Sequence, residues 1–223
     1  MYKYELINNH YVVEIDGRKF LIDTGAPSFR INNDVREIII DGKSYPLGMR
    51  PMQMDEEAIK KTIDLVGVPV DGFIGLDLIA RTSLTVYKNG QLEFKTREVE
   101  GAKAIPLKPG MGLMIKISSH GIDGDMVLDT GAKYGYLDER LIQGLEPYEK
   151  NVYDFNPHLR DMHSDMYHVE IEVGGMKKVI DAGYNKGTLG FPIGRGIILI
   201  GNITTLFDEV CVIDAERNRL FIK

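Results

Sequence analysis

One seven-residue segment occurs twice in this chain, and no other feature of the sequence constrains the fold as much. The first copy is Phe20–Ala26 and the second is Met126–Ala132. In both copies three apolar residues lead into Asp-Thr-Gly-Ala. A lone Asp-Thr-Gly is weak evidence because its residues are common, whereas two copies with matching flanks indicate an internal repeat. Each copy predicts a strand that delivers one aspartate into a tight turn.

The strands before the two copies also repeat. The first half predicts strands at residues 2–7, 11–15 and 19–22. Turns between them are predicted at Asn8-Asn9 and Asp16-Gly17, because these residue types tolerate positive φ. In the second half, 113–117 and 126–128 match the last two strands, with a turn predicted over 118–124. Each Asp-Thr-Gly is therefore expected to follow the second strand of a hairpin.

Each half closes with an apolar strand that ends near a glycine, and then with a hairpin. The apolar strands are at 70–75 and 197–201, and the hairpins are at 83–94 and 210–222. Between these landmarks the first half predicts a hairpin at 37–47 and a helix at 55–66. The second half predicts a short helix at 137–145 and a hairpin at 167–180. The chain is therefore predicted to be mostly β.

A polar stretch followed by closely spaced prolines and glycines, residues 97–112, is the best candidate for a boundary between the halves. It predicts two related lobes. The N-terminal lobe, 1–100, carries Asp23, and the C-terminal lobe, 101–223, carries Asp129.

Composition bounds the setting in which the protein works. Its 223 residues are 43% hydrophobic and 27% charged, which is ordinary for a globular protein with a buried core. The formal charge of −6 argues against nucleic acid as the main partner. No apolar run approaches the roughly 18 residues of a membrane-spanning helix, and the N-terminus has no signal-peptide pattern. Because Cys211 is the only cysteine, a reducing, cytoplasmic setting without a membrane partner is expected.

Two Asp-Thr-Gly-Ala segments, followed by the apolar-apolar-Gly strands Phe73–Gly75 and Leu199–Gly201, resemble the pepsin and retropepsin clan of aspartic proteases. The resemblance spans nearly the whole chain in the same order in both halves. Pepsin-like enzymes are longer single chains with Ser or Thr after Asp-Thr-Gly, and retroviral enzymes have Ala there but are homodimers. The resemblance implies a pepsin-like fold of two pseudo-symmetric, retropepsin-like lobes with a cleft between them, complete as a monomer.

The resemblance also implies the chemistry. Asp23 and Asp129 would form a catalytic dyad, in which one carboxyl keeps a proton and the other activates a water. Thr24 and Thr130 would join the two loops across the lobe interface. The function implied is an aspartic endopeptidase acting on extended peptide segments, with no metal and no cofactor.

The small residues of the two loops have expected roles. Gly25 and Gly131 are expected to permit a sharp turn and to present amides near the carboxyls. With Ala26 and Ala132 they are expected to contact substrate. The two alanines lack the hydroxyl that pepsins place beside the dyad, so one donor that favours the ionised form is missing. A pH optimum less acid than that of a digestive pepsin is therefore expected.

Enzymes of this clan close the cleft with a hairpin flap, and here the second half has more room for one. The flap is predicted around 151–168, with strands at 152–155 and 166–171 and a tip at 157–164. Its residues expected to contact substrate are Asn156, Pro157 and His158. The alternative flap is the hairpin at 38–47, with Tyr45 near its tip.

Several other residues favour ordinary structural roles. His158, His163 and His168 lack helical metal-ligand spacing and are expected in solvated loops. The Asp123–Asp125 segment favours a turn over a calcium site. Cys211 is expected to be buried in a strand. The glycine-rich stretch 190–196 has no helix start or Walker lysine, so it favours a loop over a phosphate-binding site.

Two alternatives to a general endopeptidase remain open. One is a catalytically silent peptide-binding module on the same scaffold. The other is a self-processing or regulatory protease of narrow specificity. Retention of both aspartates, both threonines and both glycines argues against the silent module.

Overall fold

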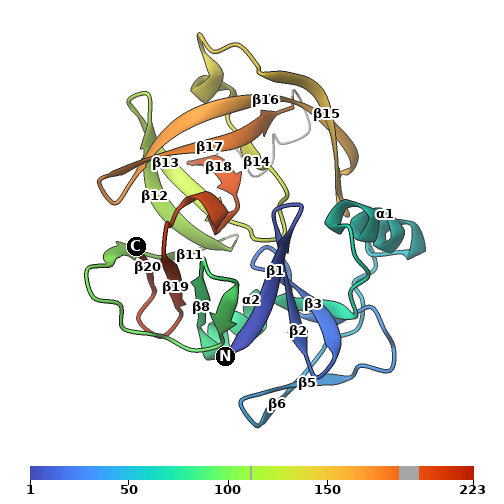
Figure 1. The fold of residues 1–223 in the computed structure, drawn as a ribbon. Helices are drawn as coiled ribbons and strands as arrows, with labels where there is room; N and C mark the ends of the chain where they lie inside the picture. Colours follow the sequence, from blue (N-terminus) through green and yellow to red (C-terminus); the bar gives the residue numbers. More distant parts are fainter. Residues whose placement is uncertain (111, 186–195) are drawn as a thin grey trace.

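The computed structural model describes residues 1–110, 112–185 and 196–223 (Figure 1). Within these ranges the strands form a ten-stranded sheet, an eight-stranded sheet and a separate two-stranded hairpin. The glycine-rich stretch predicted as a loop lies outside the described residues except for Gly196.

The first three strands form at the positions that their turns predict. They are β1 (Tyr2–Ile7), β2 (His10–Ile15) and β3 (Arg18–Asp23). Asn8 and Asn9 have φ of 46° and 67°, and Asp16 and Gly17 have φ of 51° and 73°. Positive φ at both central residues matches the right-handed twist of the flanking strands. Tight turns thus set the register that brings Asp23 to the end of β3.

The same strand arrangement holds each Asp-Thr-Gly in both halves. β3 runs parallel to β7 (Gly72–Gly75), with Asp23 opposite Gly75. β13 (Ile122–Leu128) runs parallel to β18 (Ile197–Gly201), with Leu128 opposite Gly201. The predicted repeat is therefore visible in the strand register as well as in the sequence.

Helix α1 (Glu56–Val66) begins and ends at residues that mark helix ends in the sequence. The Asp55 side chain accepts a hydrogen bond from the Ala58 N–H, and Gly67 ends the helix at φ 91°. Its buried face, with Ala58 and Ile59, packs on an apolar cluster of the first half. Figure 1 shows α1 beside one end of β15 (Glu149–Asn156), a strand of the second half.

The ten-stranded sheet joins the two halves of the chain. Its remaining strands are β4 (Phe29–Arg30), β8 (Leu84–Tyr87), β9 (Gln91–Glu93), β10 (Lys103–Pro106), β19 (Val210–Asp214) and β20 (Arg219–Ile222). β19 pairs with β8, so the last hairpin of the chain continues a sheet of the first half. Cys211 in β19 is fully buried, as predicted.

β10 was not expected, because it lies inside the polar stretch 97–112. It pairs with β20 at the edge of the sheet, where Pro106 needs no ladder partner for its nitrogen. Only Ile105 in this strand is buried. The sequence pattern of such an edge strand resembles a loop, and the pairing depends on a partner more than 100 positions away.

The second half differs from the expected elements in two places. Its remaining elements are β11 (Lys108–Pro109), β12 (Leu113–Ser119), β14 (Gly135–Leu137), η1 (Glu139–Ile142), β16 (Arg160–Val173), β17 (Met176–Tyr184) and η2 (Ile203–Thr205). The turn predicted over 118–124 involves only His120 and Gly121, both at positive φ. The helix predicted at 137–145 is wrong, because β14 occupies its start and only one short 3-10 segment follows.

Candidate active site

Both Asp-Thr-Gly turns fold in the same way. The Gly25 N–H donates to Asp23 Oδ1 at 2.9 Å, and the Gly131 N–H donates to Asp129 Oδ1 at 2.9 Å. Each carboxyl is thus fixed by an amide two residues later in its own loop. These bonds favour the ionised form of each aspartate.

Thr24 and Thr130 join the two loops behind the carboxyls. The N–H of each threonine donates to the hydroxyl of the other at 3.0 Å. The Thr24 hydroxyl donates in turn to the Leu128 carbonyl at 2.7 Å, and the Thr130 hydroxyl donates to the Ile22 carbonyl at 2.8 Å. Both threonines are fully buried. The network ties the end of β3 to the end of β13 and gives a partner to both threonine N–H groups and both hydroxyls.

Each glycine of the motif packs against the aspartate of the opposite loop. A Cβ on Gly25 would lie 2.6 Å from Asp129 Cγ, and one on Gly131 would lie 2.4 Å from Asp23 Cγ. The expected sharp turns and nearby amides are present, since Gly25 and Gly131 each donate to the aspartate two residues earlier, but neither glycine has positive φ. They are needed because a side chain at either position would collide with the facing carboxyl.

Each carboxyl lies against the glycine of the opposite loop, and burial is the main influence on the pKa of both. Burial, and then repulsion by Asp129, raise the pKa of Asp23 well above its usual range. Burial also raises the pKa of Asp129. Two carboxyls this close cannot both ionise easily, so the pair retains one proton at a pH where isolated carboxyls are charged.

Ser28 and Asp77 support the first loop from below, and sequence reasoning missed them. The Ser28 hydroxyl donates to Asp77 Oδ1 at 2.7 Å and accepts from the Gly75 N–H at 2.8 Å. A Cβ on Gly75 would lie 2.2 Å from the Ala26 carbonyl oxygen. The apolar strand must therefore end on glycine for the loop to rest on it.

Asn202 plays the equivalent part in the second half and was also missed. Its amide donates to the carbonyls of Asn9, Thr130 and Ala132 at 2.8, 3.2 and 3.2 Å. The sequence signal for these supports is a polar residue next to the apolar-Gly strand or the Asp-Thr-Gly turn, which is too common to single out.

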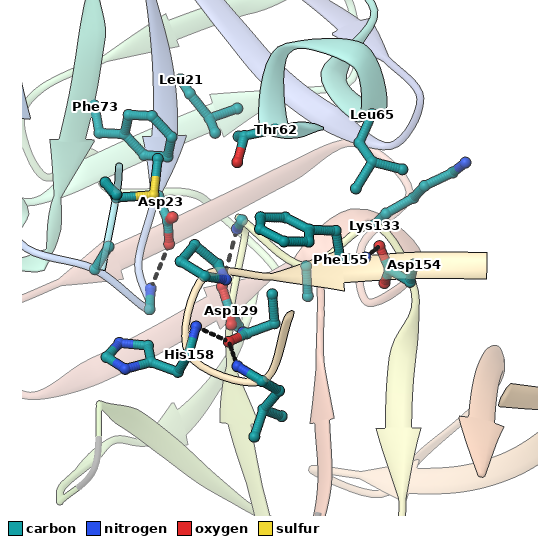
Figure 2. A pocket seen from close by; sticks show the side chains of 18 of the residues that line it. Leu21, Asp23, Thr62, Leu65, Phe73, Asp129, Lys133, Asp154, Phe155 and His158 are labelled. Atoms are coloured by element: carbon teal, nitrogen blue, oxygen red, sulfur yellow. Dashed lines mark hydrogen bonds between the residues drawn. The ribbon is translucent and has the colours of Figure 1, made fainter. Parts of the chain in front are cut away.

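A cavity of about 270 Å³ lies over the two carboxyls (Figure 2). It is lined by every residue predicted to contact substrate or to act on it: Asp23, Gly25, Ala26, Asp129, Gly131, Ala132, Asn156, Pro157 and His158. Thr24 and Thr130 lie behind this surface, as their predicted supporting role requires. The structure therefore brings the predicted residues of both halves together.

The long hairpin, β15 and β16, supplies the second-half wall of this cavity. Its tip is three residues, 157–159, because Asn156 Oδ1 accepts from the N–H groups of His158 and Leu159 at 2.9 and 3.2 Å. The predicted tip at 157–164 is too long, since β16 already begins at Arg160. The alternative flap at 38–47 contributes no residue to the cavity, and Tyr45 is buried in the core.

The tip of the long hairpin is fastened to the first half by what we call the clasp. Arg160 pairs with Asp55 at 2.7 Å, and Lys61 pairs with Asp161 at 2.7 Å. Beside these ion pairs, Phe155 packs in the apolar cluster under α1. The Lys61 ammonium lies 5.4 Å from the centre of the Phe155 ring. The hairpin therefore crosses the cavity from one half of the chain to the other.

Three polar residues that sequence reasoning missed, Tyr136, Asp154 and His10, also line the cavity. Tyr136 donates its hydroxyl to Asp154, which also accepts from the Phe155 N–H at 2.8 Å. His10 donates from Nε2 to the Gly131 carbonyl at 3.1 Å. Burial raises the pKa of Asp154 and of Tyr136, and it lowers the pKa of His10. Nothing in the sequence around these three residues marks them as neighbours.

The described residues hold neither a metal-ligand cluster nor a membrane-spanning helix. No group of three or more His, Cys, Asp or Glu side chains within 1–110, 112–185 and 196–223 is arranged to hold a metal ion. Asp125 pairs instead with Lys108 and Lys116. In the same part of the chain, no helix has the length and apolar character needed to cross a membrane.

Searches of protein-family models and of curated proteins each found no match. Among solved structures, an aspartic proteinase from Irpex lacteus is similar over 99% of this chain and 95% of that chain, with a TM-score of 0.60 and 12% identity. The protease of Simian Foamy Virus (mac) matches 42% of this chain and 90% of that chain, with a TM-score of 0.32 and 15% identity. The first similarity confirms the predicted fold class: the chain has the mostly β, pepsin-like fold of an aspartic proteinase.

Proposed function

We propose that the protein is an aspartic endopeptidase, which hydrolyses peptide bonds with a water activated by Asp23 and Asp129. The observation that carries the proposal is the pair of interacting carboxyls at the cavity, held together by the reciprocal Thr24–Thr130 hydrogen bonds. The pepsin-like fold supports the same class of reaction. Because one chain supplies both aspartates, the proposed active form is a monomer.

In the proposed reaction the ionised carboxyl takes a proton from a water held between the two aspartates. The water oxygen attacks the carbon of the scissile carbonyl, and the protonated carboxyl donates its proton to the carbonyl oxygen. The tetrahedral species then collapses and the C–N bond breaks. The carboxyl that took the water proton passes it to the leaving amine, and the other carboxyl takes a proton back from a hydroxyl of the tetrahedral carbon, which restores the dyad. The pair titrates as a unit, so the acid and base roles are not divided between Asp23 and Asp129.

The substrate we propose is an extended peptide segment lying between the two loops and the long hairpin. The loops offer Gly25, Ala26, Gly131 and Ala132 as one wall, and Asn156, Pro157 and His158 form the opposite one. An extended backbone can be held there by main-chain hydrogen bonds, while pockets select side chains. The hairpin then acts as the flap that excludes water from the reaction.

The proposed pH optimum is less acid than that of a digestive pepsin. Ala26 and Ala132 have no hydroxyl to donate to the dyad, and burial raises the pKa of both aspartates. Both effects disfavour the carboxylate that the reaction needs as its base. The dyad therefore loses its first proton at a higher pH. A pH–rate profile that peaks in strong acid would contradict this part of the proposal.

The experiment that tests the function is cleavage profiling on a proteome-derived peptide library at several pH values, with a statine-type transition-state analogue as competitor. The proposal predicts internal cleavage at many peptides and its suppression by the analogue. Peptide binding without cleavage at any pH would favour the catalytically silent module. Cleavage at one sequence alone would favour a self-processing or regulatory protease.

A further inference from the structure

Asp154 places a third carboxyl at the cavity, and it comes from the long hairpin rather than from an Asp-Thr-Gly loop. It lies on β15, opposite Met162 of β16, and it is 6% exposed. Its neighbour Tyr153 points the other way and is 39% exposed. In the view of Figure 2, Asp154 lies near Lys133, and His158 lies on the other side of Asp129. Asp154 therefore faces the space in which a substrate is proposed to lie.

The hairpin divides the lining of the cavity into two chemically different parts. Phe155 packs with Leu21, Phe73 and other apolar residues of the first half. On the opposite side, Met162 packs with Tyr136 and Ile200 of the second half. Among the cavity-lining residues of this second-half side, Asp154 is the acid that lies outside the Asp-Thr-Gly loops. A substrate side chain that enters the first part meets mostly hydrocarbon. One that enters the second part meets the Asp154 carboxyl, with Tyr136 and Lys133 also in the lining.

Asp154 makes no direct ion pair, although Lys133 and His10 are close enough to lower its pKa and so offset part of the effect of burial. Its oxygens accept from the Tyr136 hydroxyl and from the Phe155 N–H, and a carboxylate has about four acceptor positions. No Lys, Arg or His of the described residues lies within ion-pair distance of it. The Lys133 ammonium lies instead 4.9 Å from the centre of the Tyr134 ring, and the His10 ring is bonded to the Gly131 carbonyl. Buried carboxylates are normally paired with a cation.

We propose that Asp154 determines specificity by binding the ammonium or guanidinium group of a substrate Lys or Arg close to the scissile bond. An incoming cation supplies the direct ion pair that neither Lys133 nor His10 makes with Asp154. The apolar part of the cavity takes an apolar side chain of the same substrate. This inference rests on the proposed endopeptidase function and names the class of peptide that it cleaves.

The substitution that removes the charge is Asp154→Asn, which keeps the shape of the side chain. Its one oxygen can accept from the Tyr136 hydroxyl, while the hydrogen bond from the Phe155 N–H is lost, so a melting curve checks that the variant is folded. The matched control is Asp165→Asn on β16, which makes the same change in the same hairpin at a residue that does not line the cavity. The readout is kcat/KM for peptides that differ only by Lys, norleucine or Glu at the position where profiling shows a basic preference.

Wild-type protein is expected to cleave the Lys peptide at least about tenfold better than the norleucine peptide, as a charge-assisted hydrogen bond allows. Asp154→Asn is expected to remove most of that ratio while leaving the norleucine peptide nearly unchanged. Asp165→Asn is expected to change neither. A profile without basic preference, or a Lys-to-norleucine ratio that survives Asp154→Asn, overturns the proposal.

A binding measurement separates this claim from the proposed catalysis. The same peptides are titrated calorimetrically into Asp23→Asn and into Asp23→Asn/Asp154→Asn protein, where no cleavage is required. Tighter binding of the Lys peptide that depends on Asp154 supports the specificity claim even if no peptide is ever cleaved. Equal binding of Lys and norleucine peptides, or no binding of either, overturns it even if the protein proves to be a protease.

Discussion

The backbone N–H of Thr24 donates to the hydroxyl of Thr130, and the N–H of Thr130 donates to the hydroxyl of Thr24, both at 3.0 Å. The exchange relates the two halves by a local two-fold symmetry at the point where their strands end. It gives each half a hydrogen-bond partner that the other half must supply. The site therefore forms only when the two halves of the chain fold together, because neither loop makes these hydrogen bonds alone.

Thr24→Val keeps the shape of the side chain and removes its hydroxyl. The buried Thr130 N–H and the Leu128 carbonyl then lose their partner. We expect the free energy of unfolding to fall by about 1–3 kcal/mol, the cost of leaving a buried polar group unsatisfied. Chemical denaturation with a two-state fit measures it. Thr24→Ser, which retains the hydroxyl, is the control, and an equal loss from both variants would show that the hydrogen bonds are not the cause.

Gly75 and Gly201 end the two equivalent apolar strands, but their surroundings differ. A Cβ on Gly75 would meet the Ala26 carbonyl oxygen at 2.2 Å, whereas one on Gly201 would meet the flexible Met126 side chain at 3.1 Å. Gly75→Ala is therefore expected to displace the first Asp-Thr-Gly loop, with a large loss of thermal stability and of peptide cleavage. Gly201→Ala is expected to be tolerated. Similar losses from both would contradict this reading of the two strands.

The raised pKa of Asp23 makes stability depend on pH in a defined direction. Between the unfolded pKa, about 3.9, and the higher folded value, the folded chain binds more protons than the unfolded chain, so stability falls as pH rises. Asp23→Asn removes this penalty and is expected to raise the melting temperature at neutral pH. The gain should vanish below about pH 4, where wild-type Asp23 is protonated in both states.

Melting curves of wild-type and Asp23→Asn protein across this range test that expectation. Asp64→Asn, at an exposed position on α1, is the control and should leave the melting temperature unchanged at every pH. A gain from Asp23→Asn that is the same at pH 4 and at pH 7 would show that linkage to this carboxyl is not its source.

The clasp is expected to hold the long hairpin over the cavity. Lys61→Met removes the ion pair with Asp161 and the contact with Phe155. We expect faster amide hydrogen exchange at residues 154–162 and a weaker dependence of that exchange on salt, because exposed ion pairs are screened by ions. Lys60→Met, one residue earlier at an exposed position, is the control. Unchanged exchange in the Lys61→Met protein would mean that the Lys61 contacts do not hold the hairpin, and that the Arg160–Asp55 pair or the apolar contacts do.

Much of the fold can be predicted from the sequence because its turns carry local signals. Asp16-Gly17, Asp41-Gly42 and Gly174-Gly175 each mark a hairpin, and all have positive φ in the structure. Asp55 and Gly67 likewise mark the ends of α1. These signals come from residues that are adjacent in the chain, so they can be recognised from the sequence alone.

What escaped prediction depends on partners that are distant in the chain. β10 is a strand only because β20 lies beside it. The pairing of Arg160 with Asp55 requires the second-half hairpin to reach the first-half helix. Asp154 could not be recognised as a site residue, because its contact with Tyr136 and its place in the cavity depend on the tertiary structure. By contrast, Asp23 and Asp129 could be predicted as a pair, because the residues on either side of them repeat and predict the same local structure twice.

The most direct test of the account is kcat/KM for one well-cleaved library peptide, measured for wild-type, Asp23→Asn, Asp129→Asn and Asp64→Asn protein at the optimum pH. Each dyad variant is expected to lose at least about a thousandfold in kcat/KM while the control keeps wild-type activity, because neither carboxyl can activate water without the other. Folding of the variants is checked by their melting curves. Cleavage that persists in either dyad variant, at a rate near that of wild type, would contradict the central claim.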